Sequence, residues 1–276
     1  MDKLELDKLM AAAESSCDPA VFAKMKVDSF NAEVGNEPYI DCPKCKNKGF
    51  IMFLREDLSH YSARCGCMKI RTAFRRMEQS GLKETILEKT FEKFEVRESW
   101  QSQILEGARA YAKDPKGWFL IGGQSGCGKT HLCTAICHEL IRQEQDVYYM
   151  SWREDASRLK SLYGEDAQRE EMLHTLRTIP VLYMDDLFIT STRERGMMKP
   201  TAADVHLAFE ILNYRYNNRL PTIISTEMYP GHLNQVDEAL GSRIMELALP
   251  HVYTIHSAPG RNYRLRNVAG EQRRQC

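Results

Sequence analysis

The residues with the clearest chemistry form a glycine-rich loop directly behind a short apolar run. The loop has the pattern G-x-x-x-x-G-K-T of a phosphate-binding P-loop and contains Gly123, Gln124, Ser125, Gly126, Cys127, Gly128, Lys129 and Thr130. Glycines let consecutive backbone N–H groups point at one anion, and a helix that follows the loop adds the positive end of its dipole. We therefore expect a nucleoside triphosphate here, with Lys129 at its β- and γ-phosphates and the Thr130 hydroxyl at Mg²⁺.

An acidic pair later in the chain fits the same chemistry. The apolar run 179–184 is typical of a buried strand, and it ends in Asp185 and Asp186. After a P-loop, this is the Walker B arrangement. We expect Asp185 to support Mg²⁺ through water and Asp186 to orient or deprotonate the attacking water. The alternative is an Asp pair that caps a following helix.

Another apolar run ends in polar residues and could supply a nucleotide sensor. It covers residues 220–227 and ends in Ser225, Thr226 and Glu227. Because parallel strands end at the same edge of their sheet, one of these side chains should lie beside the γ-phosphate. Thr226 is our candidate, and the choice among the three stays open.

The elements that must position these groups alternate between strands and helices. We expect strands at 118–121, 146–151, 179–184, 220–227 and 251–256, with helices between them, near 129–142, 152–162, 165–177, 202–219 and 237–244. Such alternation predicts an α/β fold with a parallel sheet between helices. The expected helix 237–244 presents Arg243.

Four cysteines form a second candidate site before this core. Cys42 and Cys45 have C-x2-C spacing, and Cys65 and Cys67 have C-x-C spacing. Two close thiol pairs suit tetrahedral Zn²⁺, whereas four unligated core thiols are the alternative. The insert between the pairs predicts a hairpin strand near 49–54. We expect His60 on the surface, since four cysteines already complete the coordination shell.

The cysteine segment and the helix expected after it, at 68–79, are locally basic. Residues 42–83 include ten Lys and Arg but only three Asp and Glu. Four aromatic residues lie among them: Phe50, Phe53, Tyr61 and Phe74. Cations with interleaved aromatic rings suit single-stranded nucleic acid. A solvated helix face with core aromatics explains the pattern equally well.

Composition limits the remaining possibilities. In 276 residues, 38 Lys and Arg balance 38 Asp and Glu, so net charge does not direct the chain to nucleic acid. We expect no membrane association and a cytoplasmic location, because there is no apolar run of transmembrane length and the first residues are charged. The expected organisation is a helical arm over 1–41, a zinc-binding module with a basic linker helix over 42–95, and an ATPase domain over 96–276.

Several stretches together resemble the DnaC-like helicase loaders of bacteria and phages, a branch of the AAA+ ATPases. The prophage and phage versions are the most similar. Beyond the cysteine pairs and the P-loop, the stretches are Ser80-Gly81-Leu82, Thr90-Phe91, His131-Leu132, Met184-Asp185-Asp186-Leu187, Asn213-Tyr214-Arg215-Tyr216, Glu238-Ala239-Leu240-Gly241-Ser242-Arg243-Ile244 and Asn262-Tyr263-Arg264. The resemblance implies an AAA+ core with a five-stranded parallel sheet.

The resemblance also implies an activity. An ATP-bound loader would hold the replicative DNA helicase open and place it on single-stranded DNA during DNA replication. ATP, Mg²⁺ and Zn²⁺ would be the cofactors, the protein would form an ATP-dependent homo-oligomer, and the zinc module would bind helicase or DNA. Arg243 fits the arginine-finger position of the family.

The sequence differs from many AAA+ proteins in two respects, and three alternative functions remain open. Many AAA+ proteins have Asp-Glu where this chain has Asp185-Asp186, which leaves the hydrolysis rate open. The chain also has too few residues after its last expected strand for a helical lid, although Arg261 or Arg264 could replace the arginine of such a lid. The rivals are a transposition helper ATPase that acts with a transposase, a small-molecule kinase and a nucleotide-gated binding module.

Overall fold

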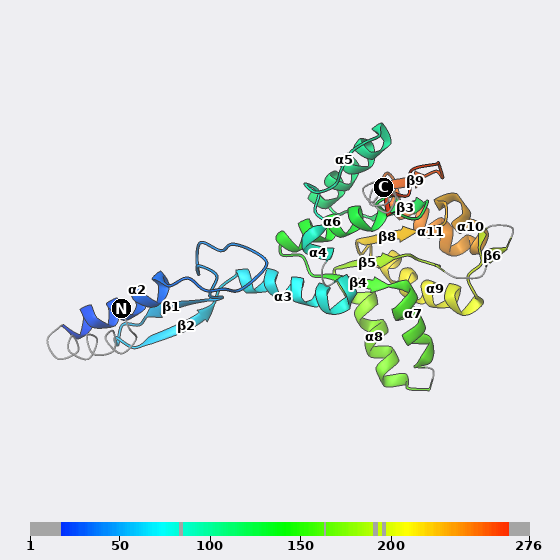
Figure 1. The fold of residues 1–276 in the computed structure, drawn as a ribbon. Coiled ribbons are helices and arrows are strands. Elements are labelled where there is room, and N and C mark those ends of the chain that lie inside the picture. The colour runs from blue at the N-terminus through cyan, green and yellow to red at the C-terminus, as the bar shows by residue number, and fades with distance from the viewer. Residues whose placement is uncertain (1–17, 83–84, 163, 190–192, 195–196, 265–276) are drawn as a thin grey trace, which may run out of the picture. The chain divides into compact units, whose positions relative to one another are not determined.

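The computed structural model describes residues 18–82, 85–162, 164–189, 193–194 and 197–264. Contacts divide the chain into two units, residues 1–72 and residues 73–276 (Figure 1). The boundary falls within α3 (Cys67–Met77). The three-part division expected from the sequence stays a prediction, and residues 1–17 of the expected arm lie outside the described residues.

The first unit contains a helix and a β-hairpin. Helix α2 (Pro19–Ala32) begins at Pro19, because Asp18 accepts a hydrogen bond from the Ala20 N–H at 2.9 Å and proline suits the first turn. Strands β1 (Phe50–Leu54) and β2 (His60–Arg64) pair antiparallel, which confirms the predicted hairpin. The Asn31 amide donates to the Met52 carbonyl at 2.9 Å and accepts from the Met52 N–H at 3.0 Å, which attaches α2 to β1.

Two residues of the basic segment 42–83, Arg71 and Phe74, are buried and stabilise the fold. The Arg71 guanidinium is fully buried and donates to the carbonyls of Glu37, Pro38 and Ile40. Arg71 therefore holds the segment before the first cysteines and is not a surface cation. Phe74 is also fully buried, with its ring 5.4 Å from that of His138. For these two residues the structure supports the packing interpretation over nucleic-acid binding.

The second unit is a three-layer α/β domain (Figure 1). Its five-stranded sheet has the order β4-β5-β8-β3-β9, and all four pairings are parallel, as predicted. The strands are β3 (Trp118–Gly123), β4 (Val147–Ser151), β5 (Val181–Asp185), β8 (Thr222–Thr226) and β9 (Val252–Ile255). Each strand ends at the same edge of the sheet, so the edge collects the P-loop, Asp185 and Thr226.

Helices cover both faces of this sheet. On one face lie α5 (Ser99–Lys113) and α6 (Lys129–Arg142), and on the other lie α7 (Trp152–Ser161), α8 (Asp166–Thr178), α9 (Ala202–Asn217) and α11 (Glu238–Ala248). The remaining elements are short: a π-helical turn at Glu78–Leu82, α4 (Thr85–Glu88), β6 (Arg193–Glu194), β7 (Met197–Met198), a 3₁₀ turn at Pro230–His232 and α10 (Leu233–Val236). Cys133 and Cys137 are fully buried in α6, where they pack in the core.

A buried arginine explains the Asn-Tyr-Arg-Tyr stretch of α9. Arg215 is inaccessible to solvent, and its guanidinium donates to the Thr222 hydroxyl at 2.9 Å, the Ile179 carbonyl at 2.8 Å and the Pro221 carbonyl at 2.6 Å. These acceptors lie just before β5 and at the start of β8. Arg215 thus joins the amino ends of two strands whose opposite ends carry the acidic and polar residues of the site.

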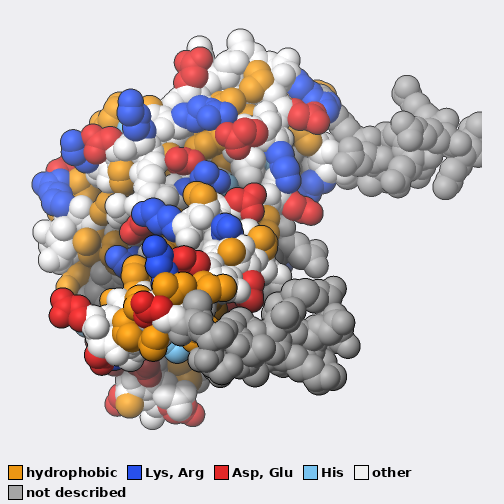
Figure 2. Space-filling view, turned by 90° about the vertical axis from the view of Figure 1, so that its left-hand side faces the viewer, with side chains coloured by type: hydrophobic (Ala, Val, Ile, Leu, Met, Phe, Trp, Pro, Cys, Tyr) orange, Lys and Arg blue, Asp and Glu red, His pale blue; other side chains and the backbone are white. Residues whose placement is uncertain are grey.

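The described surface mixes both signs of charge. In Figure 2, Lys and Arg side chains alternate with Asp and Glu, and hydrophobic side chains emerge between them. This agrees with the equal numbers of cationic and anionic residues in the chain. Among the described helices, none is both long enough and apolar enough to cross a bilayer.

Candidate functional site: a P-loop nucleotide cavity

The P-loop connects the end of β3 to the start of α6. Gly126 and Gly128 have positive φ angles of 74° and 100°, a region that disfavours other residues. A Cβ atom on Gly126 would also lie 2.0 Å from the Asn262 amide oxygen. The loop can therefore close tightly only with glycine, and it brings the amino end of α6 to the cavity that Ser125 to His131 line. This helix end favours an anion such as a phosphate.

Lys129 is the buried cation of this loop. Lys129 is only 5% exposed, and its ammonium donates to the carbonyls of Gly123 at 2.8 Å and Gln124 at 2.9 Å. These contacts hold the ammonium against the loop that would surround a phosphate chain. The next residue, Thr130, has its hydroxyl 3.4 Å from the Asp185 carboxylate. The two residues expected at Mg²⁺ are thus adjacent.

Asp185 is held by hydroxyl groups from three strands. Its carboxylate accepts hydrogen bonds from Tyr149 at 3.1 Å, from Tyr183 at 2.5 Å and from Ser225. These bonds fix the orientation of a buried carboxylate beside the Thr130 hydroxyl. A rigid carboxylate at this position is what a hard cation such as Mg²⁺ requires.

Asp186 lies at the cavity itself. Its backbone has a φ of 55°, and its N–H donates to the Ser225 hydroxyl at 2.9 Å. Burial, and then the neighbouring Asp185 carboxylate, raise the pKa of Asp186 to about 6, against the opposing effect of Lys129. A carboxyl group with a pKa near neutrality is suited to accept a proton from water.

The polar residues at the end of β8 and just after it have different surroundings. The Thr226 hydroxyl is buried, donates to the Leu187 carbonyl at 2.9 Å and accepts from the Met228 N–H at 3.1 Å. Glu227, by contrast, lines the cavity together with Asp186. Of the three sensor candidates, Glu227 is the one whose side chain faces the nucleotide space, whereas Ser225 and Thr226 brace the backbone and Asp185.

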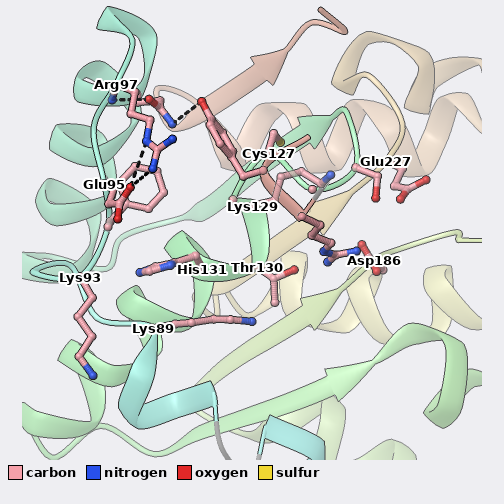
Figure 3. Close-up of a pocket in the computed structure, with 17 residues that line it drawn as sticks. Lys89, Lys93, Glu95, Arg97, Cys127, Lys129, Thr130, His131, Asp186 and Glu227 are labelled. Carbon is pink, nitrogen blue, oxygen red and sulfur yellow. Dashed lines mark hydrogen bonds and ion pairs between the residues drawn. The ribbon is translucent and has the colours of Figure 1, made fainter. Parts of the chain in front are cut away.

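The cavity has a volume of about 510 Å³ and extends well beyond the P-loop (Figure 3). Residues 89–101 form one wall, which sequence reasoning did not assign to the site. The His131 imidazole lies 2.9 Å from the Thr90 carbonyl and makes an edge contact with the Phe94 ring at 5.2 Å. Lys89 also lines the cavity, and burial lowers its pKa. In the sequence, the Thr90-Phe91 stretch, which is part of the family resemblance, could have indicated this wall.

The segment after β9 forms the other wall. The Tyr263 N–H donates to the Gly126 carbonyl at 2.9 Å, and Arg261 pairs with Glu98 at 3.0 Å. These contacts attach the carboxy-terminal segment both to the P-loop and to the wall at 89–101. Arg264 lines the cavity near Asp186, where its charge opposes the rise in the pKa of Asp186. Of the two arginines named as substitutes for a lid arginine, Arg264 reaches the cavity.

Arg243 lies in α11 and is not among the residues that line this cavity. Its guanidinium donates to the Ala239 carbonyl at 2.7 Å and stacks over the rings of Phe209 at 5.3 Å and Tyr216 at 5.5 Å. The two aromatic rings hold the side chain on the surface of its own domain. Arg243 therefore does not reach the nucleotide cavity of its own chain.

The four cysteines of the first unit come together as the sequence predicts. Their Sγ atoms all lie within 4.8 Å of one another, with Cys42 and Cys65 at 3.7 Å and Cys45 and Cys67 at 3.5 Å. A tetrahedral Zn²⁺ with Zn–S bonds of about 2.3 Å sets its sulfurs about 3.8 Å apart. Burial raises the pKa of Cys67 to about 12, against the opposing effect of a hydrogen bond from Arg71. The donor set fits Zn²⁺.

His60 is exposed at the start of β2, which confirms its predicted surface position. The four thiols thus form the candidate zinc site without it.

Comparison with known proteins agrees with this geometry. A family model described as "IstB-like ATP binding protein" matches residues 66–270. The chain belongs to this IstB-like family. It is 32% identical over 241 residues to the phage-like element PBSX protein XkdC of Bacillus subtilis strain 168, which covers 83% of this chain and 87% of that protein. It is 25% identical over 183 residues to the replicative helicase loader DnaC of Escherichia coli K12, covering 65% of this chain and 69% of the relative.

A solved structure shows a fold similar to that of this IstB-like protein. A crystal structure of the DnaC helicase loader covers 63% of this chain and 99% of its own, with a TM-score of 0.54 and 22% identity. The IstB-like chain is therefore an AAA+ ATPase that binds ATP. The family match begins at residue 66, after Cys42, Cys45 and Cys65.

Proposed function

We propose that this ATPase loads a replicative DNA helicase onto single-stranded DNA during DNA replication, in the cytoplasm. The observation that carries the proposal is the P-loop cavity bordered by residues 89–101 and 261–264, in a chain similar to a protein named as a replicative helicase loader. Because both walls contact the P-loop region, occupancy by ATP or ADP can change segments outside the core. A loader needs such coupling between its nucleotide and its grip on a partner.

The roles of the site residues follow from their positions. Lys129 would neutralise the β- and γ-phosphates, and the Thr130 hydroxyl and Asp185 would hold Mg²⁺. Mg²⁺ would supply charge neutralisation at the phosphates. Asp186 would orient the attacking water and accept its proton. We propose Glu227, which directly follows β8, in place of Thr226 as the polar group beside the γ-phosphate, since Glu227 lines the cavity.

Arg243 would act in trans within an ATP-dependent homo-oligomer. We expect Arg243→Ala to spare ATP binding and to lower the turnover of the assembled protein by about tenfold or more, since an arginine finger stabilises only the transition state. Turnover at increasing protein concentration measures this effect, and fluorescent-nucleotide titration measures binding.

Mixing variants separates action in trans from action in cis. When Arg243→Ala subunits, whose turnover is low, are mixed with Lys129→Ala subunits, which have none, activity should rise above that of either alone. Some interfaces then combine an intact P-loop with an intact Arg243. Arg243→Lys is the matched variant that keeps the cation over Phe209 and Tyr216. Unchanged turnover of the assembled Arg243→Ala protein would remove Arg243 from the mechanism.

The first unit should depend on zinc. We expect one Zn²⁺ per chain, and its removal by a chelator or by Cys45→Ser should unfold residues 42–67, because zinc-binding energy is folding energy in modules this small. Metal analysis and the thermal unfolding of this unit measure the change. His60→Ala is the matched control and should keep its zinc. A zinc-free purified protein whose stability Cys45→Ser does not alter would contradict the assignment.

A loading assay tests the function itself. A replicative helicase from the same host is offered circular single-stranded DNA that carries an annealed labelled strand, and release of that strand is followed. Strand release should require this protein and ATP, and it should fail with Lys129→Ala. Equal strand release with and without the protein would argue against a loader.

A further inference from the structure

The hairpin of the first unit carries a pair of stacked aromatic rings on one of its faces. Phe53 of β1 and Tyr61 of β2 are cross-strand partners, with ring centroids 5.5 Å apart and planes 27° from parallel. They are 42% and 43% exposed. Because side chains alternate along a strand, Phe50 lies on the opposite face, where its partner is Arg64. The Phe53–Tyr61 face thus exposes ring surface that the module does not use for its own core.

One cation lies directly at this face, within a segment that has an excess of positive charge. The Arg55 guanidinium lies 4.9 Å from the centre of the Tyr61 ring. Residues 42–72 include seven Lys and Arg but only two Asp and Glu. The Arg71 guanidinium donates hydrogen bonds to carbonyls inside the module, and the Lys48 ammonium lies over the Phe30 ring. The other five are exposed: Lys44, Lys46, Arg55, Arg64 and Lys69. Of these, Arg55 lies at the Phe53–Tyr61 face, whereas Arg64 lies on the opposite face as the partner of Phe50.

We propose that the Phe53–Tyr61 face binds single-stranded DNA by stacking its bases on these two rings while nearby cations meet the phosphates. The proposal rests on the loading function and locates a DNA contact for it. Exposed aromatic faces bind single strands with little sequence preference, because every base offers a π-face. The local excess of positive charge complements a phosphate backbone.

The same face is less suited to a protein partner. The aliphatic side chains Met52 and Leu54 lie on the opposite face of β1, with Ser62 and His60 as their partners. On the aromatic face, Ile51 packs against the cysteine cluster. The aromatic face therefore offers rings and a guanidinium but little exposed aliphatic surface. Protein interfaces bury an apolar centre, whereas single-strand sites combine aromatic rings and cations.

The test uses the full-length protein with zinc bound. Fluorescein-labelled oligo(dT) is titrated in the presence of ATP, and binding is followed by fluorescence anisotropy. The double variant Phe53→Leu/Tyr61→Leu keeps apolar volume but removes both ring faces, and we expect it to weaken binding by about tenfold or more. Phe50→Leu removes one ring from the opposite face of the same strand and is the matched control. It should bind within about twofold of the parent.

Zinc content and thermal unfolding show whether each variant keeps its fold. Ultraviolet cross-linking of oligo(dT) to the unchanged protein, followed by peptide mapping, gives a readout that needs no variant. Cross-links at residues 50–64 would support the proposal. It is overturned if the double variant binds oligo(dT) as the parent does, or if all cross-links map to residues 73–276.

Helicase binding separates this proposal from the loading function. If the double variant loses the helicase but keeps oligo(dT), the face docks a protein and the proposal is overturned. If the unchanged protein binds oligo(dT) through this face but never binds the helicase, the loading function fails while the DNA site stands.

Discussion

Replacing Lys129 by alanine should abolish ATP turnover and weaken ATP binding by about 100-fold or more. The ammonium is almost fully buried against the P-loop carbonyls, and loss of a buried charge that pairs with phosphate costs several kcal/mol, about 2–5 in comparable cases. Because the side chain points into the loop and not into the domain core, the fold should survive. Titration with a fluorescent ATP analogue and steady-state ATPase assays measure the two effects.

Lys93→Ala is the matched control for this change. Lys93 lines the same cavity, but its ammonium is exposed and donates to the Leu87 carbonyl at 3.3 Å, away from the P-loop. Its removal should change ATP affinity by less than about threefold, as expected for an exposed charge. Nucleotide affinity and turnover that both survive Lys129→Ala would contradict the P-loop assignment.

Replacing Asp186 by asparagine should lower turnover by about 100- to 10,000-fold and leave ATP binding intact. The amide keeps the size of the side chain and its place beside the Asp185 carboxylate, but it cannot accept a proton from water. Removal of a negative charge next to the phosphates should, if anything, strengthen binding. A variant that hydrolyses ATP at the parent rate would show that another group acts as the base.

The pH dependence of the unchanged protein is the companion measurement. With a pKa of about 6, Asp186 is ionised above that pH and protonated below it. The kcat/KM for ATP hydrolysis, which reports the free protein, should therefore fall as the pH drops through 6, because the proton acceptor is lost. The raised pKa also means that the folded chain binds more protons than the unfolded chain between about pH 4 and 6, so this group lowers stability as the pH rises through that window.

The sequence predicts the parts of the site that lie in one local pattern. The P-loop needs only a strand, a glycine turn and a helix in succession, and Asp185 and Asp186 follow a buried strand. The two thiol pairs likewise carry their spacing in the sequence. In each case, the chemistry depends on residues that are close together in the chain or at the shared edge of one sheet.

The rest depends on contacts between distant segments. The wall at residues 89–101 and the segment around Tyr263 meet at the P-loop through the Glu98–Arg261 pair and the Tyr263–Gly126 hydrogen bond. The periodicity of a sequence predicts helices and strands, but it does not predict which distant segments contact each other. Arg71 illustrates the same limit, because its acceptors are carbonyls and any residue can supply a carbonyl. Thr226 was a reasonable candidate by type, but only the structure shows that its hydroxyl bonds to Leu187.

The most direct test of the loading function is co-elution with the replicative helicase of the same host or phage on a sizing column with mass detection. Parallel runs contain ATP or ADP. The loading function predicts a stable complex that is favoured by ATP, and its mass gives the number of subunits. If no complex forms with either nucleotide, the loading function is contradicted, and the transposition helper, tested with a transposase, becomes the better account of this ATPase.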